Sequence, residues 1–152
     1  MPCDVTKEDQ VKSAIDKTVE TFGTIHVALA CAGVNIPSLT LTSKSSIDTK
    51  KFQLVMDINV MGSIYVAKYA AVAMSKNKAV NELGEKGVIL FVSSVAADEG
   101  QRGQVAYSAS KGAINGIVMP MARDLGRYNI RAAAIAPGII GTPMALAMPK
   151  KV

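Results

Sequence analysis

Two side chains in the sequence YSASK are spaced to act together. Tyr107 and Lys111 lie four residues apart at the start of a predicted helix, so both project from the same face. An ammonium beside a phenol stabilises the phenolate form. The spacing therefore predicts that Tyr107 acts as a general acid and base with Lys111 as its charged neighbour.

Two further polar residues are candidates for the same site. Ser94 lies thirteen residues before Tyr107, directly after an apolar run, and a parallel sheet would place it beside the first turn of the Tyr107 helix. Its hydroxyl could hold a substrate carbonyl, although a strand-end serine can also serve only backbone groups. Asn59 is the polar member of an apolar helix face and could bind a water that links Lys111 to solvent, or be purely structural.

Periodicity predicts three helices and three strands in alternation. The helices are expected over Thr6–Phe22, with Thr6 as cap, from Thr49 to about Met74, and over Tyr107–Tyr128 with Pro120 inside. Short apolar runs without alternation are typical of strands covered on both faces. They span Val27–Cys31, Val88–Val92 and Arg131–Ala136.

This order predicts an α/β fold, a doubly wound parallel sheet with right-handed crossovers. Ligands bind beyond the carboxyl ends of the strands in such folds. The candidate site is therefore assembled from the three segments that follow the strands, Cys31-Ala32-Gly33, Ser93-Ser94 and Pro137-Gly138.

The composition excludes several functional classes. With 152 residues, of which 49% are hydrophobic, the chain is long enough for one globular domain. The net charge of +5 comes from scattered lysines and arginines with few aromatic residues, so nucleic-acid binding is not expected as the primary function. Two cysteines and one histidine predict no metal site, and no apolar run is long enough for a membrane span. No targeting segment is evident.

The motifs together resemble the short-chain dehydrogenase/reductase family. The pattern S-x12-Y-x3-K is preceded by Asn59 and followed by PGIIGT at 137–142, with CAG at 31–33 and Asp4-Val5 upstream. The resemblance is closest to the branch of type-2 3-hydroxyacyl-CoA dehydrogenases, also described as 17β-hydroxysteroid dehydrogenase type 10. It is carried there by Cys31, by the segment 94–112 and by ARDL at 122–125.

That resemblance implies a Rossmann-like fold, NAD as cofactor and reversible hydride transfer with a secondary alcohol or ketone. Ser94 and Tyr107 would contact the substrate, and Ser94, Tyr107, Lys111 and Asn59 would be catalytic. The residues implied to contact the cofactor are Asp4, Val5, Cys31, Gly33, Tyr107, Lys111, Pro137, Ile140 and Thr142. It also implies a small-molecule substrate such as an acyl-CoA or steroid, a homo-oligomer, and a mitochondrial protein, with the cytoplasm as alternative.

The sequence departs from the family pattern at both ends. The glycine-rich turn G-x3-G-x-G and the acidic residue that selects NAD do not occur in it, nor does the segment expected to cover the substrate. We therefore expect residues 1–152 to form part of a Rossmann-like domain, with an unpaired edge at the first strand and little dehydrogenase activity alone. The alternative is a non-catalytic short isoform that pairs its helices Phe52–Met74 and Tyr107–Tyr128 with a full-length partner.

Overall fold

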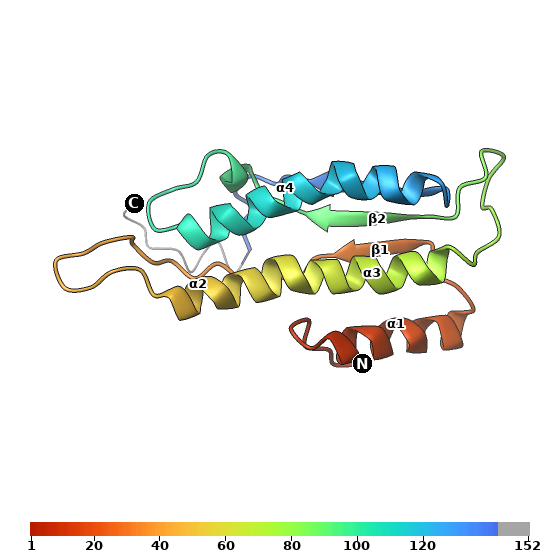
Figure 1. Ribbon diagram of the computed structural model, residues 1–152, viewed down its shortest axis with the longest axis horizontal. Coiled ribbons are helices and arrows are strands. Elements are labelled where there is room, and N and C mark those ends of the chain that lie inside the picture. Colours follow the sequence, from red (N-terminus) through yellow and green to blue (C-terminus); the bar gives the residue numbers. More distant parts are fainter. Residues whose placement is uncertain (143–152) are drawn as a thin grey trace.

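Helices and parallel strands alternate along the chain in the computed structural model, which describes residues 1–142 (Figure 1). The helices are α1 (Glu8–Phe22), α2 (Thr49–Met56), the π-helical turn η1 (Asp57–Met61), α3 (Gly62–Met74), the 3-10 turn η2 (Val95–Ala97) and α4 (Val105–Gly126). The strands are β1 (Val27–Ala30), β2 (Gly87–Val92) and β3 (Ile130–Ile135). The predicted number, type and order of the main elements are confirmed.

The three strands form one parallel sheet in the order β1-β2-β3. Val27 is paired with Val88, and Val88 with Arg131, so the strands start at nearly the same level. Their carboxyl ends consequently meet at one edge of the sheet, as the α/β prediction required. Among the described residues β1 has no neighbour on its outer side.

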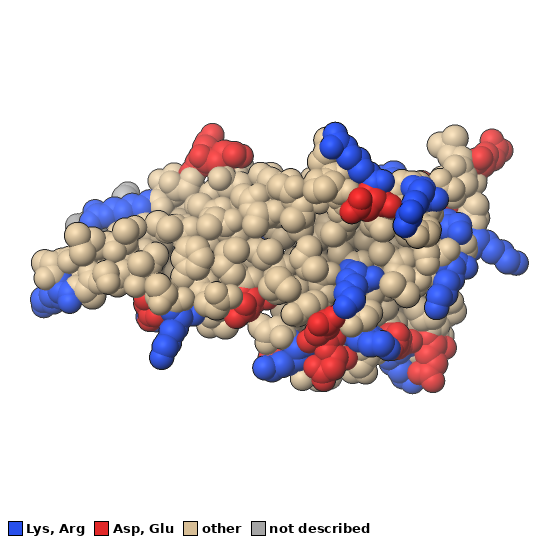
Figure 2. Space-filling view, in the orientation of Figure 1, with Lys and Arg blue, Asp and Glu red and all other residues tan. Residues whose placement is uncertain are grey.

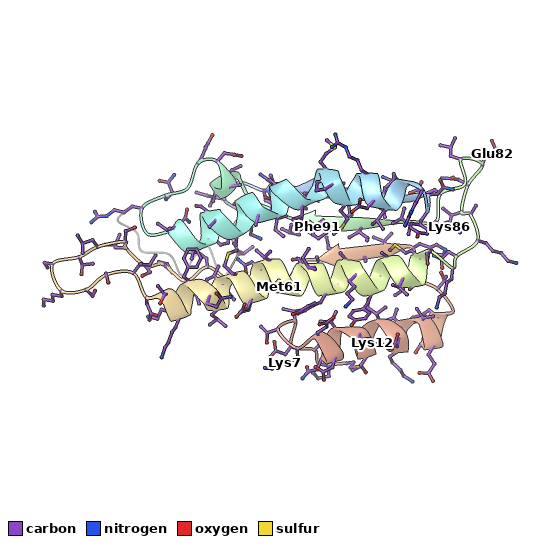
Figure 3. All side chains as sticks on the ribbon, viewed as in Figure 1. Lys7, Lys12, Met61, Glu82, Lys86 and Phe91 are labelled. Atoms are coloured by element: carbon purple, nitrogen blue, oxygen red, sulfur yellow. The ribbon has the colours of Figure 1, made fainter. Side chains whose placement is uncertain are left out.

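One face of the sheet carries the core. Helix α3 packs on β1, helix α4 packs on β3, and α1 packs on α3 rather than on the sheet (Figure 1). The largest fully buried side chains are Phe91, Met74, Ile89 and Ile114. Phe91 lies between β2 and the helical layer (Figure 3). Gly87 has no room for a side chain, because an added Cβ would lie 2.7 Å from Met74 Sδ.

The prediction that the strands are covered on both faces is wrong for β1 and β3. Side chains of β1 alternate between exposed and buried, with Val27 61% and Leu29 51% exposed, and Ile135 of β3 is 54% exposed. The two right-handed crossovers run in the same direction across the sheet and therefore place α3 and α4 on the same face. None of the described helices covers the other face.

The start of α1 differs from its predicted form, and the second helix contains an unpredicted turn. Thr6 does not cap α1, since its hydroxyl and backbone N–H both donate to Asp4 Oδ1, and the helix begins at Glu8. Helix α2 begins at Thr49 as predicted, and Asp48 caps it by accepting from the backbone N–H groups of the helix's second and third residues. The predicted helix from Thr49 to Met74 is continuous but contains the π turn η1, which the periodicity did not reveal.

Candidate active site

The segments after β2 and β3 meet as expected at the carboxyl edge. Ser93 N–H donates to Ile135 O at 2.8 Å, and Val95 N–H donates to Pro137 O at 3.1 Å. A cleft of about 650 Å³ opens there. Its walls include Ser94 and Tyr107, together with residues of the segment that follows β3.

Tyr107 and Lys111 lie on the first turns of α4, as their spacing predicted. The Lys111 Nζ atom is 5.5 Å from the centre of the Tyr107 ring. Tyr107 is half-buried and lines the cleft, whereas Lys111 is only 5% exposed and lies behind it. The arrangement places an amine next to a phenol whose hydroxyl-bearing side chain faces a ligand-sized space.

Burial controls the ionisation of Lys111. Desolvation lowers the pKa of its ammonium from the ordinary value of 10.5, and the charge interaction with Cys31 opposes this shift. Its Nζ donates to Val92 O at 2.6 Å, which anchors the side chain to the end of β2. The two other Nζ hydrogens have no partner among the described residues and are available to a ligand.

Ser94 occupies the position predicted for it, at the end of β2 and in the cleft with Tyr107. Its backbone is extended, and its Oγ accepts from Ala96 N–H at 3.1 Å to cap the short turn η2. The hydroxyl hydrogen is not spent by this contact, so Ser94 can still donate to an oxygen in the cleft. The contact with Ala96 fits the backbone role that the sequence left open, and the role of Ser94 toward a substrate carbonyl stays a prediction.

Asn59, at the centre of the π turn, holds the backbone of Val34 through two hydrogen bonds, a contact called the clamp below. Its Oδ1 accepts from Val34 N–H at 2.8 Å, while its Nδ2 donates to Val34 O at 3.0 Å and to Ser110 Oγ at 2.9 Å. The side chain is 1% exposed. Because both N–H groups of the amide are held by protein atoms, only Oδ1 retains a free lone pair for the predicted water. Isolated π turns in helices are frequent at functional sites.

Gly33 brings the segment after β1 close to these groups. A Cβ added at Gly33 would lie 3.4 Å from Asn59 Oδ1 and 3.7 Å from Lys111 Nζ, so a larger side chain would fill the space in front of both. Cys31 is exposed beside it. Neither residue lines the 650 Å³ cleft, which means that the CAG segment borders the site from a different side.

The other residues predicted to contact a cofactor divide into two groups. Ile140 and Thr142 line the cleft, and Pro137 fixes η2 through its carbonyl. Asp4 and Val5 lie outside the cleft: Val5 packs on Gly62, where an added Cβ would be 2.8 Å from Val5 Cγ2. Hydrogen bonds from the Thr6 N–H and hydroxyl lower the pKa of the exposed Asp4.

Several polar residues of the site escaped the sequence reasoning. Asn35, Glu99 and Arg102 line the cleft, and Ser110 holds the Asn59 amide. Asn35 and Arg102 are in loops, where neither helical nor strand periodicity gives a signal. Ser110 lies inside the motif YSASK, three residues after Tyr107, so a test of that helix face for polar neighbours would have found it.

Two structural features are absent from residues 1–142. No cluster of three or more potential metal-binding side chains occurs among these residues. No helix in the same range has the length and apolar character needed to cross a membrane.

Comparisons with known proteins identify the family of the chain. The sequence profile of the short chain dehydrogenase family matches residues 1–152. The human 3-hydroxyacyl-CoA dehydrogenase type-2 is 44% identical over 99% of this chain, and the protein of the same name from Drosophila melanogaster is 40% identical over 100%. The chain spans only 58% and 60% of the lengths of these two relatives.

Solved structures give the same result for the fold. The 3-hydroxyacyl-CoA dehydrogenase type-2 of Mycobacterium avium superposes with a TM-score of 0.87 at 32% identity, covering 96% of this chain and 57% of its own. An NAD+-bound xylitol dehydrogenase gives a TM-score of 0.79 at 33% identity, with 92% and 50% covered. The expected resemblance and the Rossmann-like α/β fold are thus confirmed, and the chain belongs to the short-chain dehydrogenase family.

Proposed function

We propose that this chain carries the catalytic part of an NAD-dependent oxidoreductase acting on a secondary alcohol or ketone. The observation that supports this most directly is the joint placement of Ser94 and Tyr107 in one cleft with the Lys111 amine behind Tyr107. A proton donor and a hydroxyl that binds oxygen are the two protein groups that carbonyl reduction needs.

The residues present fit a nicotinamide cofactor. Gly33 leaves an open space in front of the Lys111 Nζ, whose two unspent hydrogens could bind the hydroxyls of the nicotinamide ribose. Ile140 and Thr142 would hold the nicotinamide amide, and Cys31, Asp4 and Val5 would lie along the rest of the cofactor. When bound, the cofactor supplies or accepts the hydride.

Each catalytic side chain has one task in this proposal. Ser94 donates its hydroxyl hydrogen to the substrate oxygen and holds it in place. Tyr107 transfers the proton to or from that oxygen, and Lys111 stabilises the phenolate that remains after proton donation. Asn59 fixes the backbone at Val34 and leaves one lone pair for a water on the path to Lys111.

The proposed substrate is a 3-hydroxyacyl-CoA or a hydroxysteroid. The name of the 44% identical human relative favours the first of these. The cleft volume of about 650 Å³ lies within the range of 300–1,000 Å³ typical of small-molecule sites. By the same resemblance we propose a mitochondrial location, which imaging of a fluorescent fusion of the complete coding sequence would check.

The decisive experiment is calorimetric titration of the protein with NAD+, together with assays of NADH formation on both substrate classes. We expect binding in the micromolar range that is lost in Lys111→Ala and retained in the control Lys78→Ala, whose exposed side chain lies beyond the far end of α3. Equal binding by both variants would contradict the role of Lys111. The turnover assays use the product of the complete coding sequence, because residues 1–152 alone are expected to have little activity. Absence of turnover on both substrate classes would contradict the proposed reaction.

A second candidate function is helix-mediated pairing with another subunit. Figure 2 shows charged side chains gathered over α1, while few lie over α2, α3 and the first half of α4. Exposed apolar side chains occur on α2, η1, α3 and α4, among them Leu54, Met61 (Figure 3), Val72 and Met119. Light scattering should show a dimer or larger assembly that Met61→Glu weakens. A wild-type protein that stays monomeric at all concentrations, and that does not co-purify with a full-length homologue, would exclude this function.

A further inference from the structure

One wall of the cleft joins two loops that are far apart in the sequence. Ser38 N–H donates to Gly103 O at 2.9 Å, and Ser38 and Gln104 form an isolated parallel bridge. Gly103 has φ +85°, a left-handed conformation that other residues adopt only with strain. The loop before α4 is thereby fixed against the loop that follows β1.

The same wall holds Arg102 at a defined position. Gln101 N–H donates to Gln104 Oε1 at 2.8 Å, and Gln104 N–H donates back to Gln101 O at 3.0 Å. These two bonds close a turn around Arg102, which lines the cleft with Ser94 and Tyr107. The backbone at Arg102 is therefore held before any ligand arrives, which reduces the entropy lost on binding.

Arg102 is the one cationic residue among the described residues that line the cleft. Arg131, by contrast, is paired with Glu85 at 2.6 Å. No described residue forms an ion pair or hydrogen bond with the Arg102 side chain, although the carboxylate Glu99 lines the same cleft. The five donors of the guanidinium are consequently free for an external acceptor.

We propose that Arg102 determines substrate specificity by binding an anionic group of the substrate. This inference rests on the proposed function and narrows it to substrates that carry a carboxylate or phosphate, such as a CoA thioester, rather than neutral steroids. A guanidinium pairs well with both kinds of oxyanion. Arg102 shares its cleft with Ser94 and Tyr107 and with the residues expected at the nicotinamide amide, Ile140 and Thr142, whereas Cys31 and Gly33, expected near the ribose and the anionic pyrophosphate of the cofactor, lie outside it. The contact is therefore assigned to substrate.

The test compares one acyl group in three chemical contexts. Acetoacetyl-CoA carries phosphates, acetoacetate carries a carboxylate next to the reacting part, and the N-acetylcysteamine thioester of acetoacetate is neutral. Arg102→Gln should raise KM for the anionic substrate by about fivefold, the size of an exposed charge pair, with kcat unchanged. The KM for the neutral thioester should not move. A raised KM for acetoacetyl-CoA would identify a phosphate as the anion that Arg102 binds, and a raised KM for acetoacetate would identify a carboxylate.

Three further variants separate charge from structure. Arg102→Lys should restore most of the affinity, and Glu99→Gln should lower KM for the same substrate because it removes a repelling charge. Arg123→Gln is the matched control, since Arg123 is exposed near the end of α4 and does not line the cleft. Raising the ionic strength should raise KM of the wild type for the anionic substrate, because salt screens the charge pair. It should leave KM of Arg102→Gln nearly unchanged.

Equilibrium binding makes the result independent of catalysis. Calorimetry with CoA alone and with acetoacetate alone should show weaker binding by Arg102→Gln for one of the two, at unchanged NAD+ affinity. An equal loss for neutral and anionic ligands, no loss at all, or a loss confined to NAD+ would each overturn the proposal. If the wild type has no turnover, the proposed function fails, and the binding comparison still decides whether Arg102 recognises an anion.

Discussion

Removal of the Asn59 side chain should destabilise the protein more than removal of any single polar partner around it. Asn59→Ala would leave Val34 N–H, Val34 O and Ser110 Oγ without their present partners, which lie 2.8, 3.0 and 2.9 Å away. Leaving a buried polar group unpaired costs about 1–3 kcal/mol. Val34 is half-buried, so water can replace part of what it loses. We therefore expect a total loss of about 2–4 kcal/mol in the free energy of unfolding.

The assay is urea-induced unfolding followed by circular dichroism, with Ser110→Ala as the matched control. Ser110→Ala leaves both Val34 bonds in place and removes one contact of the amide, so it should cost about 1 kcal/mol. Asn59→Asp should lower the free energy of unfolding at least as much as Asn59→Ala. One of its carboxylate oxygens would replace Nδ2 opposite Val34 O, where it repels rather than donates.

The variants that lower stability most should also weaken NAD+ binding most. Val34 follows Gly33 directly, so a loosened Val34 would move the backbone that borders Lys111. We expect Asn59→Ala to weaken NAD+ binding more than Ser110→Ala does. A cost below about 0.5 kcal/mol for Asn59→Ala, within the range of ordinary surface substitutions, would show that the clamp is not a stabilising element and refute this reasoning.

Three more outcomes follow from individual side chains. Tyr107→Phe should reduce kcat by about 10²–10⁴-fold while NAD+ affinity, measured by calorimetry, stays within twofold of the wild type, because Phe cannot transfer the proton; retained turnover would exclude Tyr107 as the acid. Ser108→Ala should be neutral or stabilising in urea unfolding, since the buried Ser108 Oγ has no hydrogen-bond partner; a loss above about 1 kcal/mol would show that the hydroxyl does have one. Burial lowers the pKa of Lys111 below 10.5, so the unfolded chain binds more protons between the two pKa values. Stability of the wild type relative to Lys111→Met should therefore rise as pH increases through that window towards 10.5, and a difference independent of pH would contradict the shift.

The sequence predicted best what depends on local spacing. Tyr107 and Lys111 were placed correctly because four residues make one helical turn, and Ser94 because strand ends of a parallel sheet share an edge. The exposed faces of β1 and β3 were not predicted. An apolar run shows that a strand can be buried on both faces, but it does not show which helices are present to cover it. The π turn around Asn59 was not predicted either, because the spacing of apolar residues continues through it.

Contacts between distant loops were beyond the reach of pattern analysis. The wall that holds Arg102 depends on a backbone bond from Ser38 to Gly103, and no side-chain identity encodes that pairing. The sequence does indicate that Gly103 could adopt a left-handed conformation, but not what the turn would face. Specificity is therefore the part of the function that is most difficult to predict from this sequence.

The position of Lys111 is set by hydrogen bonds more than by apolar packing. Its Nζ donates to Val92 O at 2.6 Å, and its own carbonyl lies 3.2 Å from Ser93 Oγ, which is also 2.6 Å from Asn115 Oδ1. Hydrogen bonds have narrow distance and angle ranges, whereas apolar contacts tolerate changes in shape. Substitutions in the apolar core, for example at Ile114, should therefore lower stability with little effect on NAD+ affinity. Ser93→Ala should affect both, because it removes the contact that ties the catalytic helix to the end of β2.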